Sequence, residues 1–320
     1  MNEAEAIERL RGFACHPAAR GLIDDAAMFD GLVITHDTIA EGVHFLAQDP
    51  ADSVAWKLVA VNLSDLAAKG AAPAAALLSL TISEDHAWDT AFIDGIEAAC
   101  AQFELALIGG DTIALPAGAT RVFGLTAIGR AGPATPSRSG AKPGDRLWLA
   151  GTVGDSAAGL AQLKQDPTAA GPLVESYRRP VPLLAAGQAL APHAAAMMDV
   201  SDGLLLDALR LAEASGCSVT IDLDSLPLSD AYLATRGDGL DARLFAATGG
   251  DDYALLAALP PELDVLSLSL PSGTSIACIG TLGADGDRLR IVSNEKPIAL
   301  PETLGHEHHG NSASPVAGRI

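Results

Sequence analysis

The sequence predicts a mixed α/β (α+β) protein of two domains, and three observations lead to this prediction. Short apolar or β-branched runs alternate with longer amphipathic runs along the whole 320-residue chain. Apolar residues make up 49% of it, and its length favours about two domains with a large buried core. A segment rich in Pro, Gly and Ser, residues 131–144, separates two such patterns. We therefore expect domains at residues 1–135 and 136–320.

Periodicity and capping residues predict the first elements of the N-terminal half. Residues 3–11 have the pattern of a short amphipathic helix. Residues 31–37 are apolar and β-branched and stop at polar residues, which is typical of a buried strand that leads into a site. Asp52 is a suitable N-cap for a helix whose apolar residues continue to Gly70.

Three strands and one helix complete this half. Alternation over residues 74–82 predicts a strand, and a helix is expected at 85–103. A short strand at 105–108 should end at the glycine pair before Asp111, and residues 120–129 should form another strand.

A second α/β pattern follows the Pro- and Gly-rich segment. The expected strands are 146–150, 196–200, 218–223, 253–258, 275–280 and 288–292, and the expected helices begin at Asp155 or span 183–190 and 204–214. The polar tail from His306 shows no such pattern.

Composition excludes several functional classes. The formal net charge is −20, which argues against nucleic-acid binding because such proteins carry a basic surface. An anionic substrate is compatible with this charge if metal ions stand between it and the carboxylates. The four cysteines form no C-x-x-C pair, and no apolar run approaches the ~18 residues of a membrane span. The N-terminus also lacks a signal-peptide core, so we expect a cytoplasmic protein without membrane contact.

Aspartates recur beside glycines and at predicted strand ends, where α/β proteins place ligands. Short, rigid carboxylates at such turns suit Mg²⁺, which prefers oxygen ligands. The alternative for each aspartate alone is a helix cap or a turn former. The residues concerned are Asp24, Asp25, Asp37, Asp111, Asp199, Asp202, Asp251 and Asp252.

The loop G-T-V-G-D-S at residues 151–156 precedes a helix and could bind phosphate through backbone N–H groups. It lacks the Gly-Lys-Ser/Thr of a P-loop, so the residues favour a strand-to-helix turn near Asp155. His44, just after the strand that ends at Asp37, is a candidate phosphate contact, with a structural role as the alternative.

Taken together, the motifs resemble the thiamine-monophosphate kinase family of the aminoimidazole-ribonucleotide-synthetase-like ATP-binding superfamily. The motifs are D-D-A-A (24–27), T-H-D-T-I-A-E-G-V-H-F (35–45), N-L-S-D-L-A-A-K-G-A (62–71), G-G-D-T (109–112), S-R-S-G-A-K-P-G-D (137–145), G-T-V-G-D-S-A-A-G-L (151–160), R-R-P-V-P (178–182), D-V-S-D-G-L (199–204) and G-G-D-D-Y (249–253). The resemblance implies a two-domain fold of mixed sheets packed with helices. It also implies a homodimer formed through the N-terminal domain, and Mg²⁺-dependent transfer of the ATP γ-phosphoryl group to thiamine monophosphate, giving thiamine diphosphate.

The resemblance also implies roles for individual residues, and it implies no covalent nucleophile. Metal ligands would be Asp25, Thr35, His36, Asp37, Asp65, Asp111, Asp199 and Asp202. ATP contacts would be Gly110, Asp111, Arg138 and Ser201, and contacts to the thiamine phosphate would be His44 and Asp251.

Four features depart from the family pattern and keep other functions open. Ile23 replaces a glycine, His36 stands at a metal-binding position, Asp251 replaces a glutamate, and residues 301–310 lack the usual aromatic residue. The alternatives are a catalytically lapsed ATP- and Mg²⁺-binding regulatory protein or another kinase or synthetase of the superfamily. A selenide-activating kinase would need a reactive cysteine or selenocysteine near the N-terminus, for which Cys15 is a candidate.

Overall fold

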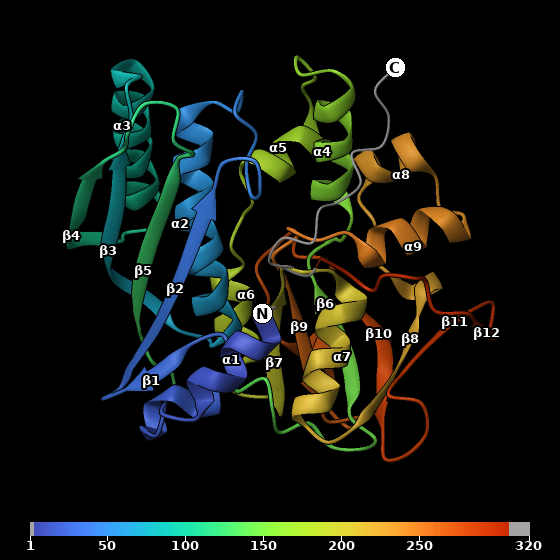
Figure 1. Cartoon of the computed structure of the whole chain (residues 1–320). Helices are drawn as coiled ribbons and strands as arrows, with labels where there is room; N and C mark the ends of the chain where they lie inside the picture. Colours follow the sequence, from blue (N-terminus) through green and yellow to red (C-terminus); the bar gives the residue numbers. More distant parts are fainter. Residues whose placement is uncertain (1–2, 307–320) are drawn as a thin grey trace.

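A five-stranded and a seven-stranded sheet, each packed with helices, make up the computed structural model, which describes residues 3–306 (Figure 1). The first sheet has the strand order β1-β2-β5-β3-β4, and its pairs are antiparallel except for the parallel pair β3–β4. Its strands are β1 (Ala27–Phe29), β2 (Leu32–Ala40), β3 (Ala72–Ile82), β4 (Ala106–Ala114) and β5 (Val122–Arg130).

The second sheet lies in the C-terminal half and has the order β12-β11-β8-β10-β6-β9-β7. Its pairs are antiparallel except for β11–β8. Its strands are β6 (Arg146–Ala150), β7 (Ala196–Val200), β8 (Ser218–Asp222), β9 (Ala254–Leu259), β10 (Ile276–Gly283), β11 (Leu289–Ser293) and β12 (Lys296–Ile298). The predicted mixed α/β class is therefore confirmed.

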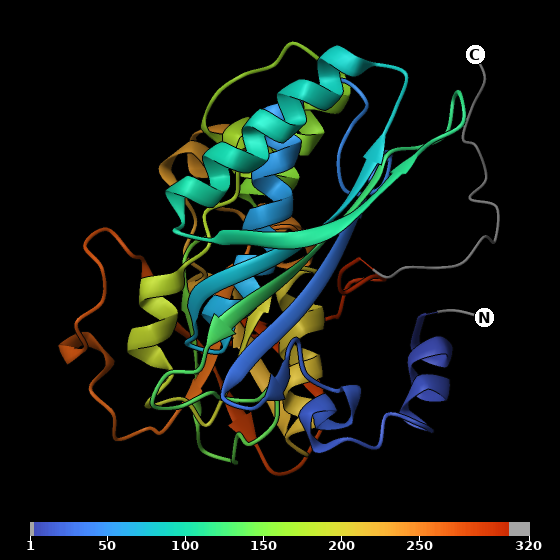
Figure 2. The ribbon, with the colours of Figure 1, turned by 90° about the vertical axis from the view of Figure 1, so that its left-hand side faces the viewer.

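The helices are distributed between the two halves. They are α1 (Glu3–Arg11), α2 (Ala51–Ala68), α3 (His86–Gln102), α4 (Asp155–Gln165), α5 (Pro172–Arg178), α6 (Leu184–Leu190), α7 (Leu204–Ala214), α8 (Asp230–Arg236) and α9 (Leu240–Thr248), with 3-10 turns at Pro17–Leu22, Leu223–Ser225 and Val265–Ser267. α1 stands apart from both sheets and contacts the first 3-10 turn (Figure 2).

α2 lies between the two halves of the molecule. It contacts β2 and β5 of the first sheet as well as β7, β9 and α6 of the C-terminal half. Among its residues, all except Asp52 and Trp56 are buried. A helix enclosed on all sides is apolar all round, and the runs of Ala, Val and Leu in α2 agree with this.

β4 forms the outer edge of the first sheet (Figures 1 and 2). All of its residues are exposed. Large apolar side chains are exposed on β4 and on its neighbours β3 and β5. They are Leu77, Leu107, Ile108, Ile113 and Val122. An apolar edge strand is a ready surface for association with another chain.

Most predicted elements occur within a few residues of their expected bounds, and the deviations have simple causes. The strand expected at 105–108 continues through the glycine pair to Ala114, so Asp111 lies inside β4 and not at a strand end. Asp37 likewise lies inside β2. Because an extended backbone accepts glycine at an exposed edge, glycine did not mark a turn here. The elements without a sequence prediction are β1, α5, α8, α9 and β12, all of which are short.

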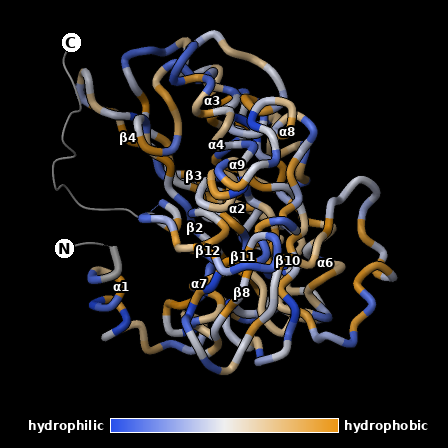
Figure 3. The backbone as a smooth tube through the Cα atoms, turned by 90° about the vertical axis from the view of Figure 1, so that its right-hand side faces the viewer, coloured by the Kyte–Doolittle hydropathy of each residue, from blue (hydrophilic) through white to orange (hydrophobic). Residues whose placement is uncertain are grey.

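Hydrophobic residues are interleaved with polar ones along the tube in Figure 3. Over the described residues, no helix has the length and apolarity needed to cross a membrane. Apart from His306, the predicted polar tail lies outside the described residues.

Candidate active site

The buried polar side chains of α2 organise the centre of the molecule. Because a buried polar group without a partner is costly, each of these side chains needs one. The Asn62 side-chain oxygen accepts the backbone N–H of Asp37 at 3.0 Å, and its amide donates to the Leu58 carbonyl at 2.9 Å. The Ser64 hydroxyl donates to the Asp199 carboxylate at 2.6 Å. α2 thus connects a strand of each sheet.

Three carboxylates meet beside α2, with oxygen atoms that all lie within 4.8 Å of one another. Asp25 comes from the turn before β1, Asp65 from α2, and Asp199 from β7. The Thr35 hydroxyl of β2 donates to the Asp65 carboxylate. Residues from four separate segments, which span both halves of the chain, therefore meet at one point.

Lysine and arginine side chains form ion pairs with Asp25 and with its neighbour Asp24. The buried Lys69 ammonium lies 2.5 Å from Asp24 and 2.9 Å from Asp25. Arg138 pairs with the other oxygen of Asp25, and Arg20 pairs with Asp24. Burial would raise the pKa of Asp25, but Lys69 and Arg138 outweigh it and hold this pKa well below its usual range. Asp25 is therefore ionised at neutral pH.

The remaining carboxylates have the opposite electrostatic environment. Burial, and then repulsion from Asp25, raises the pKa of Asp37 to about 6 and that of Asp199 to about 8. Burial, and then repulsion from Asp37, raises the pKa of Asp65 well above its usual range. These carboxyls lack enough cations to be ionised together, so a divalent cation would relieve their repulsion.

The donor set of this group fits a hard divalent cation. It consists of carboxylate oxygens with a neighbouring hydroxyl and contains no thiolate or imidazole. Oxygen-only ligands favour Mg²⁺ over zinc or copper. The residues Asp25, Asp65 and Asp199 thus form a candidate site for a divalent cation.

The turn after β7 adjoins this site and has its own internal support. The carboxylate of Asp207, on α7, accepts the backbone N–H groups of Ser201 and Asp202 at 3.1 and 3.0 Å. Arg210 pairs with Asp202 and lies 3.1 Å from Asp207. Asp202 is thus bound to an arginine, while Ser201 is exposed. The backbone N–H of His306 donates to the Asp202 carbonyl at 2.7 Å, which brings the C-terminal segment to this turn.

Two predicted residues lie elsewhere in the same chain. Asp37 pairs with Leu125 of β5, Leu125 with Leu78 of β3, and Leu78 with Gly110 of β4. Three strand spacings of about 4.8 Å place Gly110 about 14 Å from Asp37. Asp111, the next residue, is exposed on the edge strand. Within one chain, neither residue joins the carboxylate group.

His36 also points away from the site. Successive side chains of a strand lie on opposite faces, and Thr35 faces α2. The His36 ring is therefore on the outer face, where Nδ1 lies 2.9 Å from the Thr126 hydroxyl and Nε2 lies 3.3 Å from that of Thr38. A contact between its imidazole and a metal at the carboxylate group is excluded by this geometry.

The predicted acceptor-side residues, His44 and Asp251, approach each other from the two halves. His44 Nδ1 accepts the backbone N–H of Ala40 at 3.1 Å, so the ring proton of the neutral imidazole lies on Nε2, a donor. The buried Lys57 ammonium pairs with the Asp251 carboxylate and donates to the His44 carbonyl at 3.0 Å. Tyr253 donates its hydroxyl to Asp251 at 2.7 Å.

Comparison with known proteins gives the context of this arrangement. The sequence profiles described as AIR synthase related protein, N-terminal domain and C-terminal domain, match residues 23–131 and 142–291. The thiamine-monophosphate kinase of Salmonella typhimurium is 41% identical over 305 residues, which cover 90% of this chain and 91% of that protein. The chain belongs to the thiamine-monophosphate kinase family. The family expected from the motifs is thus confirmed.

Other members of the thiamine-monophosphate kinase family support this assignment. The enzyme of Caulobacter vibrioides is 42% identical over 258 residues, which cover 77% of this chain and 73% of that protein. The solved structure of AaThiL complexed with AMPPCP and TMP has a TM-score of 0.81 at 28% identity, covering 95% of this chain and 97% of that one. The family structure from Stenotrophomonas maltophilia K279a has a TM-score of 0.71 at 35% identity, covering 90% and 94%.

A hydrogenase maturation protein, HypE, in complex with ATP has a TM-score of 0.69 at 19% identity, covering 93% of this chain and 95% of its own. It shares the fold with the thiamine-monophosphate kinase family and has a different biological role. The fold alone therefore does not specify the phosphoryl acceptor.

The glycine-rich loop at residues 151–156 is held by a hydrogen bond to an aspartate of the same chain. Asp252 accepts the backbone N–H of Gly154 at 2.9 Å, at the start of α4. Burial raises the pKa of this carboxyl well above its usual range, and the hydrogen bond from Gly154 opposes the rise. Because a side chain of the same chain occupies the helix N-terminus, the loop acts as the strand-to-helix turn that the sequence favoured.

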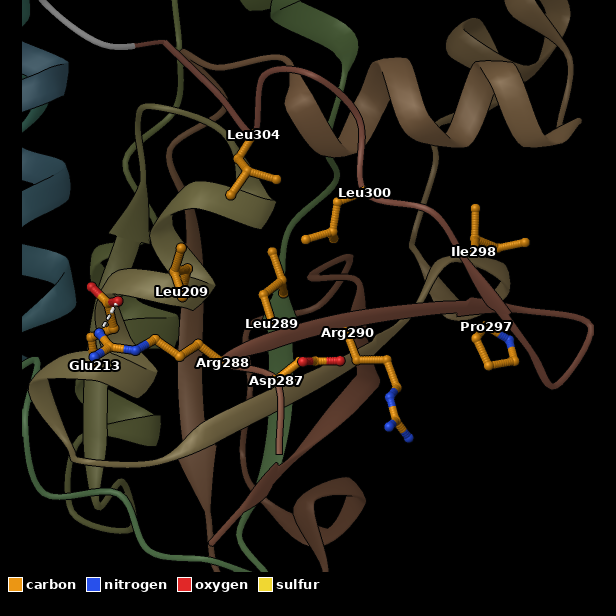
Figure 4. A pocket seen from close by; sticks show the side chains of 10 residues that line it. All are labelled: Leu209, Glu213, Asp287, Arg288, Leu289, Arg290, Pro297, Ile298, Leu300 and Leu304. Atoms are coloured by element: carbon orange, nitrogen blue, oxygen red, sulfur yellow. Dashed lines mark hydrogen bonds and ion pairs between the residues drawn. The ribbon is translucent and has the colours of Figure 1, made fainter. Parts of the chain in front are cut away.

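A groove of about 520 Å³ on the C-terminal half contains none of the predicted site residues (Figure 4). Leu209 and Glu213 of α7 line one side, and Glu213 lies 2.5 Å from Arg288. The other side is lined by residues of β11, β12 and the segment after them, including Ile298 and Leu300. This groove is separate from the carboxylate group.

Sequence reasoning missed several residues that support the site. They are Arg20, Lys57, Asn62, Ser64, Lys69, Asp207 and Arg210. A usable signal existed for those in α2, because polar residues inside a helix that is apolar on every face must be buried and paired. Arg20, Asp207 and Arg210 carried no comparable signal.

Proposed function

We propose that this chain transfers the γ-phosphoryl group of ATP to thiamine monophosphate, giving thiamine diphosphate and ADP. The observation that carries the proposal is the oxygen-only carboxylate group of Asp25, Asp65 and Asp199, in a chain 41% identical to a thiamine-monophosphate kinase. The related AaThiL has a structure with both AMPPCP and TMP bound.

The carboxylate group would hold more than one Mg²⁺ ion, with Asp37 and the Thr35 hydroxyl as neighbouring oxygen donors. Bound Mg²⁺ neutralises phosphate charge and helps to align an in-line displacement. This matters because both substrates are anionic, and two unit charges 4 Å apart repel by ~4 kcal/mol at an effective dielectric of 20.

The chain's own residues would bind and orient the two phosphates. Arg138, 22% exposed beside Asp25, and the exposed Ser201 would contact ATP, while Asp202 would add a ligand near the turn after β7. His44 would donate from Nε2 to the acceptor phosphate. Since the attacking phosphate oxygen is already anionic near neutral pH, no residue has to remove a proton from it.

We further propose a homodimer in which residues 1–135 form the interface and residues 136–320 complete the active site. β4 is an exposed, apolar edge strand, and it carries Gly110 and Asp111 about 14 Å from Asp37 of the same chain. In the dimer, β4 of one copy would supply Gly110 and Asp111 to the nucleotide site of its partner. Such an arrangement makes each active site depend on two chains.

A coupled assay of ADP release tests the proposed reaction. Turnover should require both Mg²⁺ and thiamine monophosphate, and thiamine diphosphate should be the product. Equal ATP turnover without the acceptor, or preference for unphosphorylated thiamine, would contradict the proposal. ATP binding without any turnover would instead favour the catalytically lapsed alternative.

A further inference from the structure

Lys57 is a buried cation outside the metal-binding group, and its ammonium contacts three other residues. It lies in α2 and is 2% exposed. Its ammonium pairs with Asp251, donates to the His44 carbonyl at 3.0 Å, and lies 4.1 Å from the centre of the Tyr177 ring. A single charge therefore contacts the two predicted acceptor-side segments at once.

The two segments come from different halves of the molecule. His44 belongs to the turn after β2, and Asp251 precedes β9. Asp251 and Tyr253 have φ angles of +69° and +54°, which residues other than glycine rarely adopt. Contacts must hold such a turn in place, and Ser156 adds one by donating its hydroxyl to Asp251 at 3.1 Å.

We propose that Lys57 is a positioning residue for the phosphoryl acceptor. Its ammonium sets the separation between the His44 turn and the Asp251 turn. This role rests on the proposed function, because it assigns the acceptor side to these turns. Without the ammonium, the Asp251 carboxylate would lose its cation and the His44 carbonyl would lose its donor. The His44 turn would then no longer be tied to the Asp251 turn, which keeps its backbone hydrogen bond of 2.7 Å to the Ser201 carbonyl. The nucleotide side at Arg138 and Ser201 would therefore keep its contacts.

Lys57→Met tests this role, because methionine keeps the apolar stem and removes the charge. The KM for thiamine monophosphate should rise about ten- to a hundredfold, while the KM for ATP should change less than about threefold. Calorimetry with thiamine monophosphate alone should show the same weakening. Tyr177→Phe is the matched control, since it keeps the ring against Lys57 and removes only the hydroxyl bond to Asp49, so it should change neither constant.

A double variant tests whether Lys57 acts through its partner. If it does, Lys57→Met combined with Asp251→Asn should raise the acceptor KM by less than the product of the two single effects. Fully multiplicative effects would overturn the role. Should Lys57→Met not fold, Lys57→Gln applies the same test with a neutral side chain that is still polar.

Three further outcomes separate this role from a purely structural one and from the proposed function. Equal losses for ATP and acceptor, together with a lower melting temperature, would show that Lys57 only supports the fold. A wild-type chain without turnover that depends on thiamine monophosphate would overturn the proposed function and this role with it. An active wild type whose Lys57→Met variant keeps its acceptor KM overturns the role alone.

Discussion

Removing divalent metal should make the stability of this protein fall as the pH rises from about 5 to 8. The reason is the buried acid group, where the pKa of Asp199 is raised to about 8 and that of Asp65 is raised well above its usual range. Between its unfolded and folded pKa values, such a carboxyl is protonated in the native state and ionised in the unfolded chain. The native state then binds more protons, so a rise in pH favours unfolding.

The size of the effect follows from Asp199 alone. One extra proton bound by the native state gives a slope of about −1.4 kcal/mol per pH unit. From pH 5 to the folded pKa of about 8, the free energy of unfolding should therefore fall by about 4 kcal/mol. This contribution is fully present below the unfolded pKa of 3.8, falls as the pH rises, and is completely lost by about pH 8. Asp65 adds to the slope in the same direction.

Saturating Mg²⁺ should flatten this dependence, because metal binding keeps the carboxylates ionised in the folded protein. The assay is urea unfolding across this pH range, with a chelator or with Mg²⁺. Asp199→Asn, which removes one titrating group, should flatten part of the slope in the metal-free protein. The reasoning is refuted if the metal-free stability rises with pH over this range or if Mg²⁺ leaves the slope unchanged.

Three other predictions concern single residues. Asp65→Asn should abolish turnover without lowering the melting temperature of the metal-free protein, because asparagine is neutral like the protonated Asp65 carboxyl but cannot replace it as a metal ligand. Turnover within a few-fold of wild type would contradict this. His44→Ala should raise the KM for thiamine monophosphate about ten- to a hundredfold, because a hydrogen bond to a charged phosphate is lost, and should change ATP affinity little. Equal weakening of both substrates, together with a lower melting temperature, would show that His44 only supports the fold. Inactive Asp65→Asn and Asp111→Asn chains that are mixed and refolded should recover about a quarter of wild-type activity. Half of the dimers are then mixed, and one of the two sites in each mixed dimer has both aspartates. No recovery in confirmed mixed dimers would place both residues in the site of one chain.

Local pattern was sufficient for most helices and strands. Helix α7 and strands β6 and β7 have the bounds that periodicity predicts, because each buries one face or a short continuous run. α1 also has the predicted bounds, although it stands apart from both sheets. The short helices α5, α8 and α9 were missed, because a pattern of seven to nine residues is ambiguous. At the same length, only α1 and α6 were predicted.

The sequence by itself determined the family, the mixed α/β class and the identity of the carboxylates. Motif order and residue chemistry carry this information without coordinates. Only the tertiary structure decided which carboxylates meet. Asp25, Asp65 and Asp199 converge because α2 is enclosed between the two halves, whereas Asp111 lies three strands away on the sheet edge. The structure also decided the ionisation of these groups, since the burial of Lys69 and Arg138 beside Asp25 depends on segments far apart in the chain. Sequence spacing does not encode such distances, because they arise from how the two sheets pack against one helix.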